Sequence, residues 1–270
     1  MEKPTPGLEA KPDLNGSSDE ISAQYETPAP EPFISFNALK DRIRHHYEIC
    51  SDYYYSLWYI SNSPPLPTIR EHHVLNNNRG EHIHHGYFLE PTDTKEEAQI
   101  QLIELLLERS KLPTGSTVLD VGCGIGGTSR YLAKEHRSHV TGVTISGRQV
   151  EIAKKLSAEV AGAIVSEKDG PTKLGDGSVR FLELDAEKMG DFFTAEPNKA
   201  TFDCVWISEA MSHLPNKELF FRNATLLLNP GGKLVVADWF KNEGLTEKQM
   251  DADIKPIEGT APFSFSTGIF

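Results

Sequence analysis

The sequence predicts an α/β protein built on a doubly wound, mostly parallel sheet. Three observations support this fold class. Strand-like and helix-like segments alternate after Pro113, a glycine-rich turn directly follows the first strand-like segment, and the 270 residues have an ordinary globular composition, 38% hydrophobic and 24% charged. Strands that are joined by helical crossovers form parallel sheets with helices packed on both faces.

The expected strands are short apolar runs. They cover residues 117–121, 139–143, 179–184, 202–207 and 233–238. The helices between them are expected at 128–135, 147–161 and 217–227. The polar, glycine-rich residues 166–178 are expected to form a surface loop, and residues 229–232 a turn.

The chain is expected to divide into a disordered tail, a helical and lid segment, and the α/β domain, at residues 1–32, 33–110 and 111–270. Prolines recur in the tail among Glu, Asp, Ser and Gly, so this part can bury little apolar surface. The second part is expected to contain helices at 38–58 and 94–110. Between them, residues 59–79 carry clustered prolines and asparagines, which favour a loop insertion.

The charge of the chain argues against nucleic acid as a partner. Lys and Arg number 27 against 39 Asp and Glu, a net charge of −12, whereas nucleic-acid binding rests on cations that neutralise phosphates. Cys50, Cys123 and Cys204 are widely spaced and fit neither a disulfide framework nor a zinc pattern, so they suit a reducing cytosol. We find no secretory signal and no apolar run of the roughly 20 residues that span a bilayer. A cytoplasmic protein without a transmembrane segment is therefore expected.

The strongest local motif is the run VLDVGCGIGG at residues 118–127, in which buried strand residues lead directly into a glycine turn and a helix. Gly122 and Gly124 allow the backbone to turn tightly and approach a ligand closely, whereas Gly126 and Gly127 allow the next helix to pack near the strand. The glycines also satisfy the G-x-G-x-x-G pattern of dinucleotide sites. A dinucleotide is therefore one candidate ligand.

Asp120 separates a dinucleotide from a cationic ligand. Its carboxylate, two residues before Gly122, would repel a pyrophosphate and attract a ligand that carries an amino group and a sulfonium. The dinucleotide pattern also requires an acid about 20 residues further on, where this sequence has Thr, Gly, Val and Thr at 141–144. The sequence therefore favours S-adenosylmethionine over NAD.

Five motifs in order extend this interpretation: VLDVGCGIGG, VTGVTISGRQVEIAK, LELDAEKM, FDCVWISEAMSHLPNKELF and LNPGGKLVVADW. Together they resemble the class I S-adenosylmethionine-dependent methyltransferases, which have a Rossmann-like fold. They are similar in particular to the tocopherol and sterol methyltransferase branch and its fungal secondary-metabolite relatives. The resemblance covers about residues 38–249 apart from 59–79, and it is specific for the cofactor and unspecific for the acceptor.

The resemblance implies a position for each cofactor-binding residue around S-adenosylmethionine. Its amino-acid portion would lie near Asp120, Gly122, Gly124 and Gly126, and its ribose near Thr144, Ile145 and Gln149. Its adenine would lie near Asp185 and Ala186, and its transferred methyl near Ser208 and Glu209. An alternative for Asp185 is a helix N-cap before Glu187.

The histidines carry the catalytic expectations. The run GEHIHHGYF at 80–88 resembles the lid segment of this branch, and a surface or helix-start role stays open for it. No Cys or carboxylate cluster completes a metal site with its histidines, so no metal is expected. If the acceptor is a hydroxyl, His84, His85 or His213 is the candidate general base; an amine or an activated carbon needs none. Five aromatic residues are expected to line the acceptor pocket, to shield the sulfonium by cation–π contact, or to pack against the sheet: Tyr47, Tyr53, Tyr54, Tyr55 and Trp58.

Two segments depart from the resemblance. In this branch the tract like YYYSLW runs almost directly into the histidine-rich segment, so residues 59–79 are either a surface insertion or a retained intron. Class I methyltransferases follow their fifth strand with a helix and an antiparallel strand pair, for which residues 239–270 are short. The sheet is therefore expected to lack its last C-terminal strands and to leave the fifth strand at an edge.

The function expected from these observations is methylation of a small, lipophilic metabolite on oxygen, nitrogen or carbon, in secondary metabolism. One alternative is a catalytically impaired, regulatory protein that still binds the cofactor. A nucleotide-dependent oxidoreductase is disfavoured by Asp120. The acceptor molecule and the oligomeric state are left open.

Overall fold

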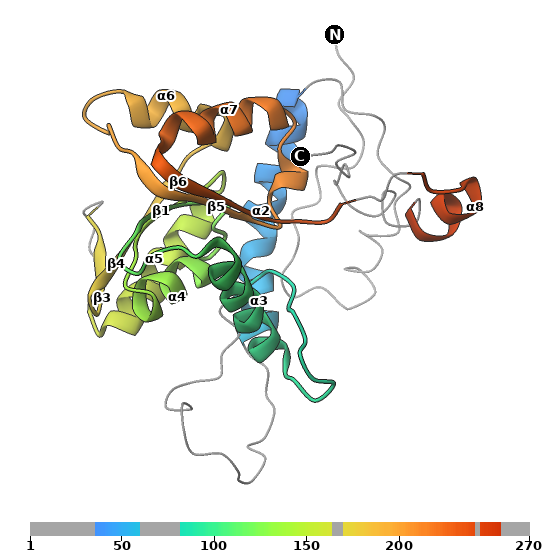
Figure 1. The fold of residues 1–270 in the computed structure, drawn as a ribbon, viewed down its shortest axis with the longest axis horizontal. Helices are drawn as coiled ribbons and strands as arrows, with labels where there is room; N and C mark the ends of the chain where they lie inside the picture. Colours follow the sequence, from blue (N-terminus) through green and yellow to red (C-terminus); the bar gives the residue numbers. More distant parts are fainter. Residues whose placement is uncertain (1–35, 60–81, 164–169, 241–243, 255–270) are drawn as a thin grey trace.

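A computed structural model describes residues 36–59, 82–163, 170–240 and 244–254 (Figure 1). The predicted tail and nearly all of the predicted insertion lie outside these residues. The predicted domain boundaries therefore remain predictions. None of the helices in the described part of the chain combines the length and the apolar character that a membrane span needs.

The protein forms a six-stranded sheet with the strand order β3-β4-β2-β1-β5-β6. The strands are β1 (Thr117–Val121), β2 (His139–Thr144), β3 (Thr172–Leu174), β4 (Gly177–Glu183), β5 (Phe202–Ser208) and β6 (Leu228–Ala237). Every neighbouring pair is parallel except β3 and β4, which are antiparallel. The predicted doubly wound, mostly parallel sheet and its five predicted strands are confirmed.

Helices cover both faces of the sheet (Figure 1). The α-helices of the described residues are α2 (Phe36–Tyr59), α3 (Lys95–Ser110), α4 (Gly127–Glu135), α5 (Gly147–Ala161), α6 (Met189–Thr194), α7 (Lys217–Leu227) and the short α8 (Glu247–Gln249), which lies away from the sheet. One apolar core joins α3, α4 and α5 to one face, and a second joins α6 to α7 and the opposite face. Val118 and Leu119 show the alternation that this requires, because these consecutive β1 residues belong to different cores.

The helix starts follow from local hydrogen bonds. Thr94 and Glu97 form a reciprocal capping box at the start of α3. Ser146 caps α5 by accepting the backbone N–H of Gln149, and Asn216 caps α7 in the same way. All five predicted helices begin and end within two residues of their expected positions.

The predicted surface loop at 166–178 is wrong in its second half. Thr172–Leu174 forms β3 and pairs with the start of β4, and Leu174 lies opposite Gly177. Gly175, with a φ of 64°, permits the two-residue turn between them. Gly177 packs so tightly that a Cβ there would lie 2.1 Å from the Ala133 carbonyl oxygen. The glycines that suggested a loop therefore serve a hairpin.

The other end of the sheet is formed by β6. The predicted turn at 229–232 lies inside this strand as an irregularity, because Phe202 pairs with Leu228 and Cys204 pairs with Lys233. No strand follows β6 in the described residues, 238–240 and 244–254. Within the described sheet, β6 is therefore the edge strand, as expected.

Candidate functional site

The glycine turn lies at the carboxyl edge of β1, in the middle of the sheet. Gly122, Gly124 and Gly126 have φ values of 74°, 54° and 80°, a region that L-residues with side chains rarely adopt. The backbone N–H groups of Gly122 and Cys123 donate to the carbonyl oxygen of Val143 at 2.8 and 3.0 Å. Ligands of open α/β sheets bind at this edge. The sequence and the fold therefore agree on the position of the site.

The surroundings of the three glycines differ. A Cβ at Gly122 would lie 2.3 Å from the Cβ of Ala210, and a Cβ at Gly126 would lie 2.5 Å from Cζ of Phe181. A Cβ at Gly124 would meet only Ile83 Cδ1, at 3.8 Å. Gly122 and Gly126 therefore have packing roles within the protein, and Gly124 has the most open approach of the three.

Asp120 is a buried carboxylate just before this turn. Asp120 is 3% exposed, and its Oδ2 accepts a hydrogen bond from Ser129 Oγ at 2.6 Å. Burial raises its pKa from 3.8 to about 6, and the Ser129 hydrogen bond opposes this rise. A buried negative charge here favours a cationic ligand and disfavours a pyrophosphate.

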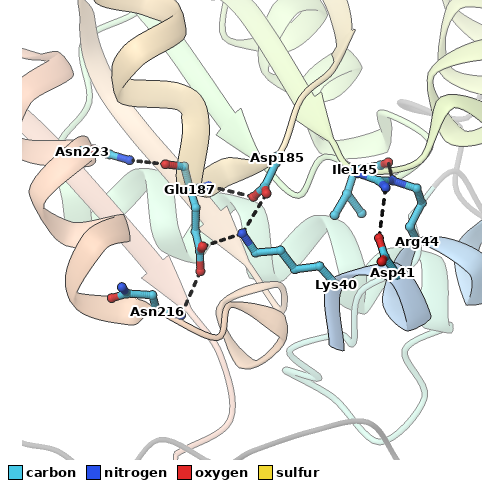
Figure 2. Close-up of polar contacts among 8 residues, drawn as sticks. All are labelled: Lys40, Asp41, Arg44, Ile145, Asp185, Glu187, Asn216 and Asn223. Atoms are coloured by element: carbon cyan, nitrogen blue, oxygen red, sulfur yellow. Dashed lines mark hydrogen bonds and ion pairs between the residues drawn. The ribbon is translucent and has the colours of Figure 1, made fainter. Parts of the chain in front are cut away.

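The residues predicted to lie beside the ribose gather where β2 ends and α5 begins. Thr144 and Gln149 are buried, and the Thr144 hydroxyl donates to Gln149 Oε1 at 2.6 Å. The carbonyl oxygen of Ile145 accepts a hydrogen bond from Arg44 Nε of α2 at 3.3 Å (Figure 2). Thr144 and Gln149 therefore support the strand-to-helix turn, and Ile145 contacts the helix that covers it.

The end of β4 presents an ion cluster that sequence analysis did not anticipate (Figure 2). Asp185 Oδ1 accepts the backbone N–H of Glu187 at 2.9 Å, so the predicted N-cap alternative is confirmed; the buried Ala186 follows it. Lys40 Nζ of α2 lies 2.8 Å from Asp185 Oδ2 and 2.5 Å from Glu187 Oε2. The only signal for Lys40 in the sequence is its i, i+4 spacing with Arg44, because its partners lie far away in the chain.

Glu187 extends this cluster to α7. Its Oε1 accepts the backbone N–H of Asn216 at 2.9 Å, and its carbonyl oxygen accepts Asn223 Nδ2 at 3.0 Å (Figure 2). Residues 185–187, part of the motif predicted to lie on the adenine side, are thus connected to α2 on one side and to α7 on the other.

The end of β5 brings together Glu209 and His85. Glu209 has a φ of 53°, and its backbone N–H donates to the Ala237 carbonyl oxygen of β6 at 2.7 Å. Its Oε1 accepts the backbone N–H of His85 at 3.0 Å, and its Oε2 lies 2.6 Å from His85 Nδ1. Ser208, the last residue of β5, pairs with Ala237. Of the residues predicted near the transferred methyl, Glu209 is thus paired with a candidate base.

Of the other candidate histidines, His84 is buried and His213 is half-buried. His84 Nδ1 lies 2.7 Å from the His85 carbonyl oxygen, and its Nε2 lies 3.3 Å from Nδ1 of the buried His82. Burial lowers the pKa of both rings. Burial also lowers the pKa of His213 to about 4, and its Nε2 lies 3.0 Å from the Tyr47 hydroxyl. Within the described ranges, no group of three or more His, Cys, Asp or Glu residues could hold a metal ion.

The aromatic expectations are met only in part. Tyr47 contacts His213 with its hydroxyl group and edge-on with its ring, at a centroid distance of 5.7 Å. The side chains of Tyr53, Tyr54, Tyr55 and Trp58 lie outside the described residues. Other aromatic residues that sequence analysis did not single out are exposed near the end of β6 and after His85: Tyr87, Phe88, Trp239 and Phe240.

Comparison with known proteins identifies one family and several relatives. Residues 94–262 match the family described as a methyltransferase domain. The chain is 37% identical over 165 residues to the 2-methyl-6-phytyl-1,4-hydroquinone methyltransferase of Synechocystis sp.. The aligned region covers 59% of this chain and 45% of that protein. It is 31% identical over 169 residues to a probable chloroplastic tocopherol O-methyltransferase of Oryza sativa, which covers 59% of this chain and 41% of that protein. It is 33% identical over 164 residues to O-methyltransferase rstn1 of Aspergillus nomiae, which covers 60% of this chain and 64% of that protein. The chain thus spans about half the length of the first of these relatives.

Solved structures share the fold. A mycolic acid cyclopropane synthase complexed with SAH and CTAB superposes with a TM-score of 0.53 at 24% identity, over 81% of this chain and 62% of that one. Phospholethanolamine N-methyltransferase 2 of Haemonchus contortus superposes with a TM-score of 0.52 at 18% identity, over 87% of this chain and 42% of that one. These likenesses support the predicted Rossmann-like fold class.

Proposed function

Because this chain belongs to the methyltransferase-domain family, we propose that it binds S-adenosylmethionine and transfers a methyl group to a small, lipophilic molecule. The observation that carries the proposal is the buried carboxylate of Asp120 just before a turn in which Gly122, Gly124 and Gly126 have positive φ values and Gly124 leaves the backbone open to approach. When bound, the cofactor supplies an electrophilic methyl group on a positively charged sulfur. The ligand is thus a cation that also carries an amino group, and the negative charge at Asp120 suits it.

The residues of the sheet edge fit the parts of this cofactor in order. Asp120 and the turn glycines would hold its amino-acid portion, and the strand-to-helix turn formed by Thr144, Ile145 and Gln149 would lie beside the ribose. Asp185 and Ala186 would lie beside the adenine, and their position is fixed by the N-cap hydrogen bond of Asp185 and by its ion pair with Lys40. Ser208 and Glu209 would lie near the transferred methyl.

The contribution of the protein to methyl transfer is alignment and exclusion of water. Helix α2 is fastened to the sheet edge through Lys40 and Arg44 (Figure 2). Segment 82–87 is fastened to α3, because Gln99 Nε2 donates to the carbonyl oxygens of His82 and His84 at 3.1 and 2.5 Å. Two covers from the N-terminal part therefore flank the glycine turn, which supports the predicted lid role of this part.

A lipophilic acceptor is supported by two observations. Trp239 is exposed and packs edge-on against His85, which Glu209 holds, and the exposed Tyr87 and Phe88 follow His85 in the chain. The relative from Synechocystis is named for a phytyl-substituted hydroquinone. The net charge of −12 supports a small molecule over a nucleic acid as the acceptor. A role in secondary metabolism and a cytoplasmic location remain parts of the proposal, although the rice relative is named chloroplastic.

Methyl transfer from labelled cofactor tests this function. The purified chain would be incubated with methyl-labelled S-adenosylmethionine and a panel of alkylated hydroquinones, phenols and amines, and the label in the organic phase would be counted. We expect labelled product from the wild type and from Asp176→Asn, a control at an exposed carboxylate 3.8 Å from Arg137. Asp120→Asn is expected to reduce the labelled product by about 100-fold, since a lost charge interaction in a desolvated site costs about 2–5 kcal/mol. Equal labelling by Asp120→Asn would contradict the proposed role of this carboxylate.

A further inference from the structure

His85 is held by Glu209 in a two-point contact. Glu209 Oε1 accepts the backbone N–H of His85 at 3.0 Å, and Oε2 lies 2.6 Å from Nδ1 of the same residue. The Glu209 side chain is 18% exposed, whereas that of His85 is 68% exposed. The imidazole is therefore fixed at Nδ1 while the rest of the ring faces outward.

Both members of the pair are fixed against the glycine turn by neighbouring residues. Ile83, two residues before His85, lies 3.8 Å from the position of a Cβ at Gly124. Ala210, the residue after Glu209, lies 2.3 Å from the position of a Cβ at Gly122. The segments that carry His85 and Glu209 thus both contact the turn that the proposed function assigns to the cofactor.

The segment that carries His85 is also rigidly attached to α3. A Cβ at Gly86 would lie 2.5 Å from the Cβ of Ala98, and the backbone N–H of Tyr87 donates to the Ala98 carbonyl oxygen at 2.8 Å. Preorganised groups are more effective in catalysis than groups that must first be ordered. The position of His85 is therefore set by packing on both of its sides.

The contact with Glu209 determines which ring nitrogen carries the proton. An ionised carboxylate only accepts hydrogen bonds, so Nδ1 of the neutral imidazole must be the donor. Nε2 is then the unprotonated nitrogen and can accept a proton. His84 and His213 do not offer this arrangement, because His84 is buried, His213 is half-buried, and the Nε2 of each is already in contact with another side chain.

We propose that His85 is the general base that accepts the proton of a phenolic hydroxyl on the acceptor, and that Glu209 is its positioning residue. This inference rests on the proposed methyltransferase function. The acceptor O–H proton moves to His85 Nε2 while an oxygen electron pair forms the bond to the methyl carbon. The carbon–sulfur bond of the sulfonium donor breaks, its electron pair stays on the sulfur, and the imidazolium beside Glu209 then releases its proton to water.

The choice of a phenol follows from the acidity of the hydroxyl group and from the surroundings of His85. A phenol has a pKa of about 10, whereas an aliphatic hydroxyl resembles water, at about 15.7. A side-chain base therefore removes the proton of a phenol far more easily than that of an aliphatic alcohol. Trp239, which is 55% exposed, packs edge-on against the His85 ring at a centroid distance of 5.0 Å and offers an aromatic face to the acceptor.

The tautomer of His85 tests the inference without any turnover. In a ¹⁵N-labelled chain at a pH of about 9, where ordinary imidazoles are neutral, we expect long-range ¹H–¹⁵N spectra to show the proton of His85 on Nδ1. His85→Gln assigns the signals by removing them. A proton on Nε2 in the wild type would overturn the inference, because that nitrogen could then accept no proton.

Glu209→Gln provides the sharpest variant. The single amide oxygen of Gln would be taken by the backbone N–H of His85, so the amide NH₂ would face Nδ1 and donate to it. The proton of His85 is therefore expected to move to Nε2, and its two nitrogen signals to exchange character. Glu218→Gln, at an exposed carboxylate that pairs with Arg222 on α7, is the matched control and should leave the His85 signals unchanged. An unchanged tautomer in Glu209→Gln would overturn the positioning role.

The acceptor class is tested on the same samples with 4-methylphenol, a phenol that keeps its hydroxyl proton at this pH, in the presence of S-adenosylhomocysteine. A saturable shift of the His85 Nε2 signal in the wild type, lost in Glu209→Gln and not produced by cyclohexylmethanol, is expected. No response to the phenol, or an equal response to the alcohol, would overturn the assignment of a phenolic acceptor. Calorimetric titration of the same proteins with S-adenosylmethionine, without S-adenosylhomocysteine, separates failure of the proposed function from failure of this inference. Absence of cofactor binding would contradict the proposed function, whereas the tautomer of His85 tests its pairing with Glu209 independently.

Discussion

Replacing Lys40 with methionine is expected to loosen helix α2 from the sheet edge. The substitution keeps most of the aliphatic stem and removes the ammonium group, which lies 2.8 Å from Asp185 Oδ2 and 2.5 Å from Glu187 Oε2. Burial alone would lower the pKa of Lys40, but the hydrogen bonds to the two carboxylates outweigh it and raise the pKa. The ammonium is therefore stabilised in its charged form, and its removal leaves two carboxylates without their shared cation.

The expected magnitude follows from the burial of the three side chains, which are 14%, 11% and 10% exposed. Exposed ion pairs contribute about 0–1 kcal/mol, whereas removing one partner of a fully buried pair costs about 3–5 kcal/mol. With a small exposed fraction on each partner, the intermediate value of about 2 kcal/mol is expected for Lys40→Met. Lys155→Met, at an exposed α5 lysine, is the matched control.

Urea unfolding measures this difference, and amide hydrogen exchange locates it. We expect the free energy of unfolding to fall by about 2 kcal/mol in Lys40→Met, and protection to decrease in α2 more than in the central strands. A loss within about 0.5 kcal/mol of the control, the range of an ordinary surface substitution, would refute the account of Lys40 as the fastening of α2.

Three further changes test the described packing and charges. Gly177→Ala should reduce the free energy of unfolding by about 2 kcal/mol or more, because the new Cβ would meet the Ala133 carbonyl oxygen at 2.1 Å; urea unfolding measures this. Asp120→Asn should gain stability relative to the wild type as the pH rises from about 4 to about 6, because burial raises the pKa of Asp120 to about 6 and its ionisation then costs the folded state up to about 3 kcal/mol. His213→Gln should lose less stability than the wild type as the pH falls from about 6.5 to about 4, because burial lowers the pKa of His213 to about 4; unfolding curves over this pH range measure both effects.

Each of these changes has its own contradicting result. Gly170→Ala is the control for the hairpin, because its Cβ would meet nothing within 4 Å; equal stability of the two alanine variants would argue against the packing of Gly177. A stability difference between Asp120→Asn and the wild type that does not change with pH would contradict a raised pKa. A wild type and His213→Gln that lose stability in parallel on acidification would contradict a lowered pKa at His213.

Local patterns explain what could be predicted from the sequence. The apolar runs of β1, β2, β4, β5 and β6 and the glycine turn are visible within short windows, because strand burial and positive φ impose residue types directly. The N-cap at Asp185 belongs to the same class, since its hydrogen bond reaches only two residues along the chain. The hairpin of β3 and β4 was missed because Gly175 and Gly177 are equally typical of a loop and of a tight turn.

The parts of the site that were missed depend on residues far apart in the chain. Lys40 and Asp185 are 145 positions apart, and His85 and Glu209 are 124 positions apart, so no local spacing indicates that they meet. Glu209 was predicted only as a residue near the transferred methyl, and the structure shows it holding a histidine. Among the three predicted histidines, His84 is buried, His213 is half-buried and His85 is exposed, and such differences depend on tertiary packing rather than on the local sequence.

The most direct test of the central claim is calorimetric titration of the purified chain with S-adenosylmethionine at a pH of about 7.5, above the raised pKa of Asp120. The account predicts saturable binding by the wild type and by Asp176→Asn, and a Kd raised by about 100-fold in Asp120→Asn, which corresponds to roughly 3 kcal/mol. Absence of binding by the folded wild type, or an unchanged Kd in folded Asp120→Asn, would contradict it.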